Sequence, residues 1–178
     1  QLGASQHRVV KLDLSHLTDC SLTNSDLSIP QYSASSEIPT TYVPGRNTIF
    51  LSIALSWAES LQASAVIIGV SSVDYSGYPD CRPEYIDAFR QLATLGTKCG
   101  IQGNPIEIKT PLLHLDKKDT ILLGTSVQTP YALTISCYQA TPSGEACGTC
   151  DSCVLRKNGF AAAQTPNPTR YIEKIDIK

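Results

Sequence analysis

Apolar residues along the chain alternate between short unbroken runs and longer periodic stretches. The clearest periodic stretch covers residues 48–62, where apolar side chains recur every three or four positions, as on one helix face: Phe50, Leu51, Ala54, Leu55, Ala58 and Leu61. Residues 65–70 are apolar without interruption, which is typical of a strand buried on both faces. The pattern therefore predicts a helix followed by a central strand.

Two further strands are predicted, one on each side of this pair. Residues 8–14 are predicted to form a buried strand that leads into a short helix near residues 14–17. The other strand covers residues 106–109, after a loop over residues 100–105. Residues 18–40 are rich in Ser, Thr, Pro and Asn, which predicts a long loop, either a lid over a site or a locally disordered segment.

Three more helices are predicted from the signals at their ends. A proline at position 83 suits the first turn of a helix over residues 83–97. Asp116 is expected to cap a short helix over residues 116–124, and a last helix covers residues 152–163. Because strands alternate with helices, we expect one α/β domain over residues 1–178 with a mostly parallel sheet.

Two polar segments follow predicted strands and are candidates for a binding site. They are the serine-rich loop over residues 18–40 and the turn-rich segment over residues 71–82. In parallel sheets, ligands bind beyond the carboxyl ends of the strands, where such segments gather. Neither the dinucleotide-binding pattern G-x-G-x-x-G nor the P-loop pattern G-x-x-x-x-G-K-[ST] occurs in the sequence.

A group of cysteines near the carboxyl end predicts a metal site. Four of them fall within seventeen residues, the last three spaced C-x2-C-x2-C: Cys137, Cys147, Cys150 and Cys153. Tight turns can direct such sulfurs to one point, and Gly148 permits a close turn. Zn²⁺ favours four thiolates in a closed tetrahedron, so we predict a structural zinc site at residues 137–153, with Arg156 and Lys157 offsetting part of its negative charge. An iron–sulfur cluster uses the same ligands and stays open, whereas sulfurs so close in sequence pair poorly as disulfides.

Composition narrows the functional classes. The chain has 178 residues, 42% of them hydrophobic and 17% charged, which is typical of a globular domain. A net charge of −2 and a pI of about 5.9 disfavour direct nucleic-acid binding, which usually needs a basic surplus. No apolar run approaches the length of a membrane span, and seven cysteines without a secretory signal indicate a reducing cytoplasm. Because the chain contains no methionine, we expect that an N-terminal part is missing from it.

Six motifs occur in one order along nearly the whole chain: Tyr42-Val43-Pro44-Gly45-Arg46-Asn47-Thr48-Ile49-Phe50-Leu51-Ser52, Asp74-Tyr75-Ser76-Gly77-Tyr78-Pro79-Asp80-Cys81-Arg82-Pro83-Glu84, Thr110-Pro111-Leu112, Ser136-Cys137-Tyr138-Gln139, Ala146-Cys147-Gly148-Thr149-Cys150-Asp151-Ser152-Cys153 and Pro168-Thr169-Arg170-Tyr171. In this combination the chain resembles the 7-cyano-7-deazaguanine synthase family of the queuosine precursor pathway. The resemblance implies an adenine-nucleotide α-hydrolase-like fold, a three-layer sandwich, with a four-cysteine zinc site. It also implies that ATP with Mg²⁺ drives the conversion of 7-carboxy-7-deazaguanine and ammonia into the nitrile, through an activated carboxylate and an amide, and by analogy a homodimer.

One part of the family's pattern does not occur in the sequence. The family's first strand ends in a phosphate-cradling Ser-Gly-Gly-x-Asp-Ser loop, and the 178 residues contain none. Backbone N–H groups at a helix N-terminus hold phosphates in such loops. We therefore expect that this chain alone neither binds ATP tightly nor turns over. Ile135 also stands where the family usually has a tryptophan, which affects packing more than chemistry.

The resemblance assigns roles to four residues for which the sequence alone offers simpler explanations. Asp80 would read the guanine-like edge of the substrate, since a carboxylate can accept both of its N–H donors. Arg82 would bind the substrate carboxylate or a phosphate in a forked geometry. The alternative is that Asp80 and Arg82 cap the following helix and pair on its surface. Arg46 and Asn47 precede a helix N-terminus, where they form either an anion site or an ordinary cap.

Three more residues complete the candidate site. Lys117 matches a lysine that relatives place near phosphate, although a lysine beside Lys118 is most often solvated. Asp74 would hold Mg²⁺ or substrate, or only form a turn, and Tyr78 is assigned to substrate binding. Cys81 is predicted to be structural, because no histidine lies near it in sequence to activate a thiol. Two other functions stay open: a related tRNA-modifying thiolase, against which the acidic pI argues, and a zinc-stabilised binding remnant without catalysis.

Overall fold

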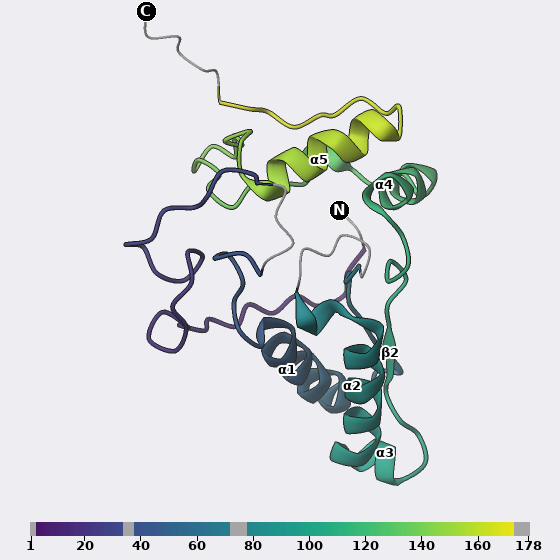
Figure 1. The fold of residues 1–178 in the computed structure, drawn as a ribbon. Coiled ribbons are helices and arrows are strands. Elements are labelled where there is room, and N and C mark those ends of the chain that lie inside the picture. The colour runs from purple at the N-terminus through teal and green to yellow at the C-terminus, as the bar shows by residue number, and fades with distance from the viewer. Residues whose placement is uncertain (1–2, 34–37, 72–77, 173–178) are drawn as a thin grey trace, which may run out of the picture.

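Figure 1 shows the fold in a computed structural model, which describes residues 3–33, 38–71 and 78–172. Two strands, β1 (Ala65–Ile67) and β2 (Glu107–Lys109), pair in parallel, with Val66 opposite Ile108. The predicted parallel pairing is confirmed, although β1 covers only the first half of the apolar run at residues 65–70.

Helices make up most of the regular structure in the described part of the chain. Their bounds, with two short 3-10 turns, are α1 (Arg46–Ser60), η1 (Pro79–Cys81), α2 (Pro83–Gly96), α3 (Lys98–Ile101), α4 (Lys117–Ser126), η2 (Tyr131–Leu133) and α5 (Asp151–Ala162). Four of the helices lie within two residues of their predicted ends. The exception is α3, part of which falls where the sequence predicted a loop. The predicted cap of α4 is confirmed, because the Asp116 carboxylate accepts the backbone N–H of Asp119 at 2.7 Å.

The main core lies between the sheet and one layer of helices. Leu51 and Leu55 of α1 and Phe89 of α2 pack on the face of the sheet that carries Val66 and Ile108. On the other face Ile67 is 69% exposed, so the prediction that this strand is buried on both faces is wrong for the described residues. A strand becomes buried on both faces only where helices cover both, and here α1 and α2 cover one.

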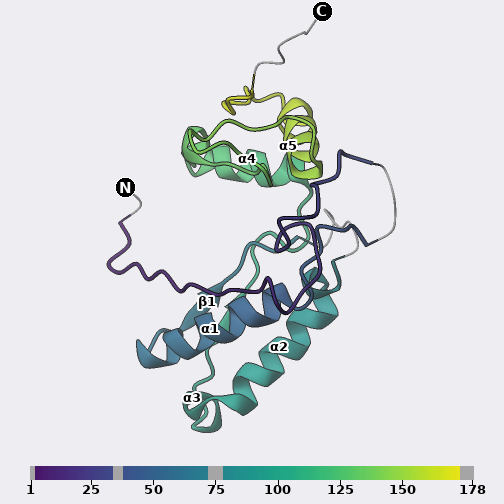
Figure 2. The same cartoon turned by 90° about the vertical axis from the view of Figure 1, so that its left-hand side faces the viewer.

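The N-terminal segment corrects a second prediction. Residues 8–14 form no strand in the structure, and Val9 and Val10 are 74% and 58% exposed. The segment runs beside α1 (Figure 2), where Val9 and Phe50 line one shallow hollow. An apolar alternation becomes a strand only with a neighbour to pair with, and none of the described strands pairs with this segment. The expected helix near residues 14–17 is a single turn, in which the Thr18 N–H donates to the Leu14 carbonyl at 3.1 Å.

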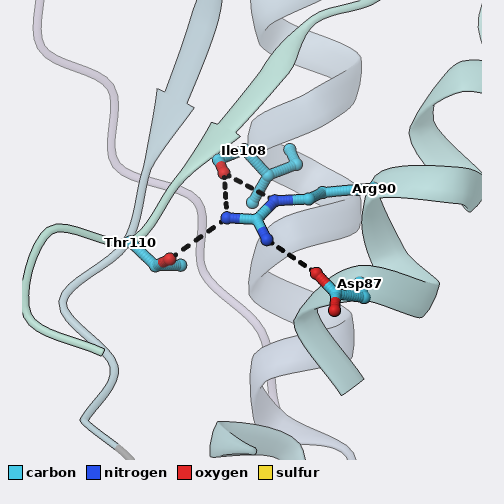
Figure 3. Close-up of polar contacts among 4 residues, drawn as sticks. All are labelled: Asp87, Arg90, Ile108 and Thr110. Atoms are coloured by element: carbon cyan, nitrogen blue, oxygen red, sulfur yellow. Dashed lines mark hydrogen bonds and ion pairs between the residues drawn. The ribbon is translucent and has the colours of Figure 1, made fainter. Parts of the chain in front are cut away.

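Arg90 of α2 ties the helix layer to β2 (Figure 3). Its Nε and Nη2 both donate to the carbonyl of Ile108 at 3.1 Å, and Nη2 also reaches the Thr110 hydroxyl at 3.3 Å. Its Nη1 pairs with Asp87 at 2.7 Å on the helix surface. The guanidinium therefore satisfies a carbonyl on the free edge of β2, which no described strand covers.

A second helical group lies apart from α1, α2 and α3. In both views α4 and α5 lie side by side near the carboxyl end of the chain. Ile121, Phe160 and Ala163 form their common core, and the Tyr131 ring meets Phe160 edge to face at 5.2 Å between centroids. None of the helices in residues 3–33, 38–71 and 78–172 is long and apolar enough to cross a membrane.

Candidate active site and metal centre

The four predicted cysteines converge at the start of α5. The sulfur atoms of Cys137, Cys147, Cys150 and Cys153 all lie within 4.8 Å of one another, and those of Cys147 and Cys153 are 3.9 Å apart. In a tetrahedral site with Zn–S bonds of about 2.3 Å, the sulfurs lie about 3.8 Å apart. All seven cysteines are free, so no disulfide competes. The spacing and chemistry of these donors fit one tetrahedral metal ion.

Backbone N–H groups surround the sulfurs and favour their ionised form. The Cys147 sulfur accepts the N–H groups of Thr149 and Cys150, both at 3.4 Å, and the Cys137 sulfur accepts the Cys147 N–H at 3.3 Å. Burial opposes ionisation of Cys147 most strongly, yet these N–H donors outweigh it and lower its thiol pKa from 9.0 to about 5. Burial raises the pKa of Cys153. Thiols this close ionise together only beside a cation, and a bound dication would supply that charge.

Other segments hold the metal centre from two sides. Ala146 pairs with the C-terminal segment, since its N–H donates to the Arg170 carbonyl at 2.8 Å and its carbonyl accepts the Ile172 N–H at 3.0 Å. From the serine-rich loop, the Tyr32 N–H donates to the Thr149 carbonyl at 2.9 Å. Part of the loop predicted over residues 18–40 therefore packs on the metal centre, and residues 34–37 lie outside the described part.

A cavity of about 500 Å³ lies between the sheet-bearing core and the α4–α5 pair. Its walls come from the start of α1, the residues that follow β1, the start of α4, the segment that leads to Cys137, and α5. Ile68, Gly69, Val70 and Ser71 continue directly from β1, so the cavity begins at the carboxyl end of that strand. This is the place where a parallel sheet offers its ligand site.

The described walls of the cavity carry positive charge only. Arg46, Lys117 and Arg156 contribute cationic side chains, and no aspartate or glutamate occurs among the described lining residues. Low-dielectric walls that carry one sign of charge concentrate ligands of the opposite sign. The arrangement therefore suits an anionic ligand.

Aromatic side chains line the same cavity. Tyr78 lies just before η1 in the sheet-bearing group, and Tyr138 follows the metal ligand Cys137. The Arg46 guanidinium lies 5.7 Å from the centroid of the Tyr78 ring, and the Thr41 and Tyr78 hydroxyls are 3.0 Å apart. Burial, followed by the hydrogen bond with Tyr78, raises the pKa of Tyr138, so this phenol stays protonated at neutral pH. Neutral rings beside cations form a surface on which a flat heterocycle can stack.

The structure brings four of the predicted site residues together. Arg46, Asn47, Tyr78 and Lys117 line the cavity. Asp74 lies outside the described residues. The structure does not show Arg46 or Asn47 as the cap of α1. The residue at the cap position is Gly45, which has no side chain that could form a cap hydrogen bond.

Asp80 and Arg82 are not among the described lining residues. The Asp80 side chain is 5% exposed, and its Oδ2 accepts the backbone N–H of Asn47 at 2.9 Å. The Asn47 amide returns a bond to the Asp80 carbonyl at 2.9 Å and donates to the Cys81 sulfur at 3.3 Å. Asp80 thus satisfies the N-terminus of α1 from a distant turn. Arg82 is exposed at the cap of α2, and no ion pair joins it to Asp80 among the described side chains.

Sequence reasoning missed several cavity residues, chiefly in the segment around the cysteines. Ser136, Tyr138 and Ser152 each stand beside a metal ligand, and Arg156 follows Cys153 by three positions on α5. A signal for Arg156 existed, because residues 153, 156 and 160 share one helix face, and all three are buried. Cys81 was predicted to be structural, and its half-buried sulfur lies at the cavity wall.

Comparison with known proteins gives a consistent result along the chain. The family model described as "Queuosine biosynthesis protein QueC" matches residues 1–164. A "7-cyano-7-deazaguanine synthase" of Coxiella burnetii (strain RSA 331 / Henzerling II) is 55% identical over 170 residues, which are 96% of this chain and 75% of that protein. Proteins of the same name from Saccharophagus degradans and Legionella pneumophila are 54% and 52% identical, covering 96% and 99% of this chain and 76% and 77% of theirs. The chain therefore belongs to the QueC family of queuosine biosynthesis proteins.

Proposed function

We propose that this chain carries the substrate cavity of an ATP-dependent ligase that converts 7-carboxy-7-deazaguanine and ammonia into 7-cyano-7-deazaguanine. The supporting observation is the cavity between the two helical groups, which is cationic, free of acidic side chains among its described residues, and lined by tyrosines. Family membership supports the product, since the relatives are named for the nitrile, and the acid, ammonia and ATP are proposed from the resemblance.

The chemistry explains why such a cavity needs cations. Two oxygen atoms leave the carboxyl carbon on the way to a nitrile, and each is a poor leaving group until ATP activates it. The substrate carboxylate and the phosphates are anions, so Arg46 and Lys117 would neutralise charge that develops during activation. Tyr78 and Tyr138 would stack on the flat bicyclic ring and exclude water from the activated carboxyl group.

Three further residues, Asp80, Arg82 and Asp74, belong to the proposed site. Asp80 stays our proposal for the reader of the guanine-like edge, because its buried Oδ1 has no hydrogen-bond partner among the described residues and a ligand N–H would supply one. Arg82 and Asp74 keep their proposed roles, carboxylate or phosphate binding and Mg²⁺ or substrate binding, on the resemblance alone. We also propose that tight ATP binding requires a Ser-Gly-Gly-x-Asp-Ser loop, which these 178 residues do not contain.

We propose zinc as the metal of the four-cysteine site, because a closed set of four thiolates with these short spacings is typical of structural zinc. Such a site leaves no coordination position for a substrate, so the metal would act through the position of its ligands. Four thiolates of this kind need a reducing compartment, which supports a cytoplasmic location. The uncovered sheet face around the exposed Ile67 supports the proposed three-layer sandwich, in which a further layer would cover that face, and a homodimer remains a proposal by analogy.

One assay tests the proposed function. Metal-loaded protein is incubated with 7-carboxy-7-deazaguanine, ammonium, ATP and Mg²⁺, and mass spectrometry follows the acid, the amide and the nitrile. The 178-residue chain is compared with a form extended by a Ser-Gly-Gly-x-Asp-Ser segment, and we expect nitrile only from the extended form. Ligand-dependent melting without nitrile in either form would support the binding remnant instead and refute the ligase.

A further inference from the structure

Arg156 occupies an unusual position for an arginine. Its residue is 7% exposed, on the buried face of α5 one turn after the metal ligand Cys153, and it lines the cavity. Its guanidinium lies 5.0 Å from the centroid of the Phe160 ring, which packs against it. Arginine is rarely buried to this degree unless its charge meets a partner.

The hydrogen-bond partners of Arg156 are all neutral. Nε donates to the Thr169 hydroxyl at 2.6 Å and Nη1 to the Ser136 hydroxyl at 3.2 Å. Nη2 donates to the Thr134 hydroxyl at 2.9 Å and to the Tyr131 carbonyl at 3.3 Å. These four bonds fix the plane of the guanidinium. Three of the partners precede α5 in the sequence, within residues 131–136, and the fourth, Thr169, follows it. Burial lowers the pKa of Arg156; Tyr171, Tyr131 and the Cys153 thiol oppose this shift, and no carboxylate is among them.

The bonds leave part of the cation available. A guanidinium has five N–H groups, and four of them are used, so one N–H of Nη1 has no partner among the described residues. No acidic side chain lines the described cavity, so no carboxylate compensates the positive charge there. A buried charge without a counter-ion is costly, which makes a bound anion the natural partner.

The metal centre is another group that the positive charge of Arg156 could neutralise, since four thiolates and a dication are together negative. Lys157 neutralises the charge of the metal centre more directly. Its ammonium donates to the carbonyl of Gly148 between two metal ligands at 3.1 Å, and it lies 4.2 Å from the centroid of the Tyr171 ring. Lys157 is exposed and does not line the cavity, whereas Arg156 does. Lys157 therefore neutralises the metal centre, and Arg156 contributes its charge to the cavity.

We propose that Arg156 is the fixed cation of the cavity and binds an oxyanion group of the ligand, either the carboxylate of the deazaguanine acid or a phosphate of the nucleotide. This inference rests on the proposed function and extends it to a residue of the metal-bearing helix. A guanidinium whose plane is already fixed loses little freedom on binding, so it orients the oxyanion as well as attracting it. Arg156 then links the metal centre to the position of the reacting group.

The test compares ligands that differ in charge. Binding of the acid, the neutral nitrile, ATP and inorganic pyrophosphate is measured by calorimetry for the metal-loaded wild type, Arg156→Gln and Arg156→Lys. Lys118→Gln is the matched control, because it removes one positive charge from an exposed residue of α4 that does not line the cavity. Metal content and circular dichroism are recorded for each protein, which separates loss of the site from loss of the fold.

We expect Arg156→Gln to weaken binding of the acid by about tenfold or more and to leave the nitrile unchanged, since a charge-assisted bond is lost only with the acid. If the phosphate is the partner, ATP and pyrophosphate lose affinity in place of the acid. Arg156→Lys is expected to restore part of either loss, and Lys118→Gln to cause none. Equal weakening of acid and nitrile, or no weakening of any anion, would overturn the assignment.

A second measurement covers the case in which the variants do not fold. In wild-type protein with ¹⁵N-labelled arginine, the Arg156 guanidinium resonances should shift on addition of the acid or of pyrophosphate, and not with the nitrile. Unchanged resonances under saturating anion would also overturn the assignment. Wild-type protein that binds only pyrophosphate, through Arg156, would refute the proposed function and keep the anion site, whereas binding of none of the four would refute both.

Discussion

Replacing Gly159 with alanine tests how α4 and α5 fit together beside the cavity. A Cβ at this position would lie 2.3 Å from Cγ of Lys117 and 3.0 Å from Cδ1 of Ile121. Carbon atoms in good contact are about 3.5–4.0 Å apart, so α4 must move away from α5. The contacted atoms of Lys117 lie near its backbone, so its ammonium group would shift with the helix.

Two opposing effects set the sign of the change in stability. In a helix interior alanine is favoured over glycine by about 1 kcal/mol. Overpacking a well-filled core costs about 1–3 kcal/mol, and Gly159 is buried beside Ile121 and Phe160. We expect the packing effect to exceed the helix propensity, with a net destabilisation of about 1 kcal/mol. For a chain of this size that lowers Tm by about 2–4 °C.

Gly96→Ala provides the matched control, because a Cβ at Gly96 would meet only Cδ2 of Leu92, at the ordinary distance of 3.9 Å. Thermal melting followed by circular dichroism should show a lower Tm for Gly159→Ala and an unchanged or higher one for Gly96→Ala. Pyrophosphate affinity, measured by calorimetry, should fall only in Gly159→Ala, because Lys117 moves. A rise in Tm for both variants, with equal affinities, would refute the reasoning.

Three further predictions concern the metal, the start of α1 and the cavity thiol. Chelation of the metal or Cys150→Ser should reduce helix content and abolish anion binding, because Arg156 lies on the same helix; circular dichroism that stays unchanged after complete metal loss would contradict this. Asp80→Asn should destabilise the fold by about 1–3 kcal/mol in urea unfolding, because the charged acceptor of the Asn47 N–H is lost; a change near zero would show that the bond contributes little. Burial, then the charge of Asp80, raises the pKa of the Cys81 thiol above 9.0, so its neutral form, and any stability that depends on it, persists below pH 9 and is lost as pH rises further. Iodoacetamide should therefore alkylate Cys81 slowly at pH 8 and faster only above pH 9, as mass spectrometry would follow, and a rate equal to that of free cysteine at pH 8 would contradict it.

The helices could be predicted because their signals are local. Pro83 begins α2 and Asp116 caps α4, and both act within one turn of the chain. The strands depend on distant partners, so residues 8–14 carry an apolar pattern that nothing in the described sheet pairs with. The same reason explains Ile67, whose exposure depends on which elements cover its face rather than on its neighbours in sequence.

The metal site and four residues of the cavity could also be anticipated. The spacing of cysteines within one short segment largely determines how close their sulfur atoms can lie, so the four candidate ligands could be predicted from the sequence. Arg46, Asn47, Tyr78 and Lys117 were found through the resemblance, because their motifs precede or follow the elements that place them. Arg156 was missed as a site residue, since a cation beside four thiolates has an obvious role there, and only the fold shows that it lines the cavity.

Residues that line the cavity lie next to metal ligands along the chain, and this arrangement couples the metal centre to the cavity. Ser136 and Tyr138 flank the ligand Cys137, Ser152 precedes the ligand Cys153, and Ser152 also donates to the Ser136 carbonyl at 2.6 Å. A closed metal site cannot touch the ligand, yet it fixes the residues that do. Linkage then requires reciprocity: whatever factor the metal adds to anion affinity, a bound anion adds to metal affinity. The equilibrium affinity for the metal should therefore rise when the cavity is filled, although the two sites share no atom.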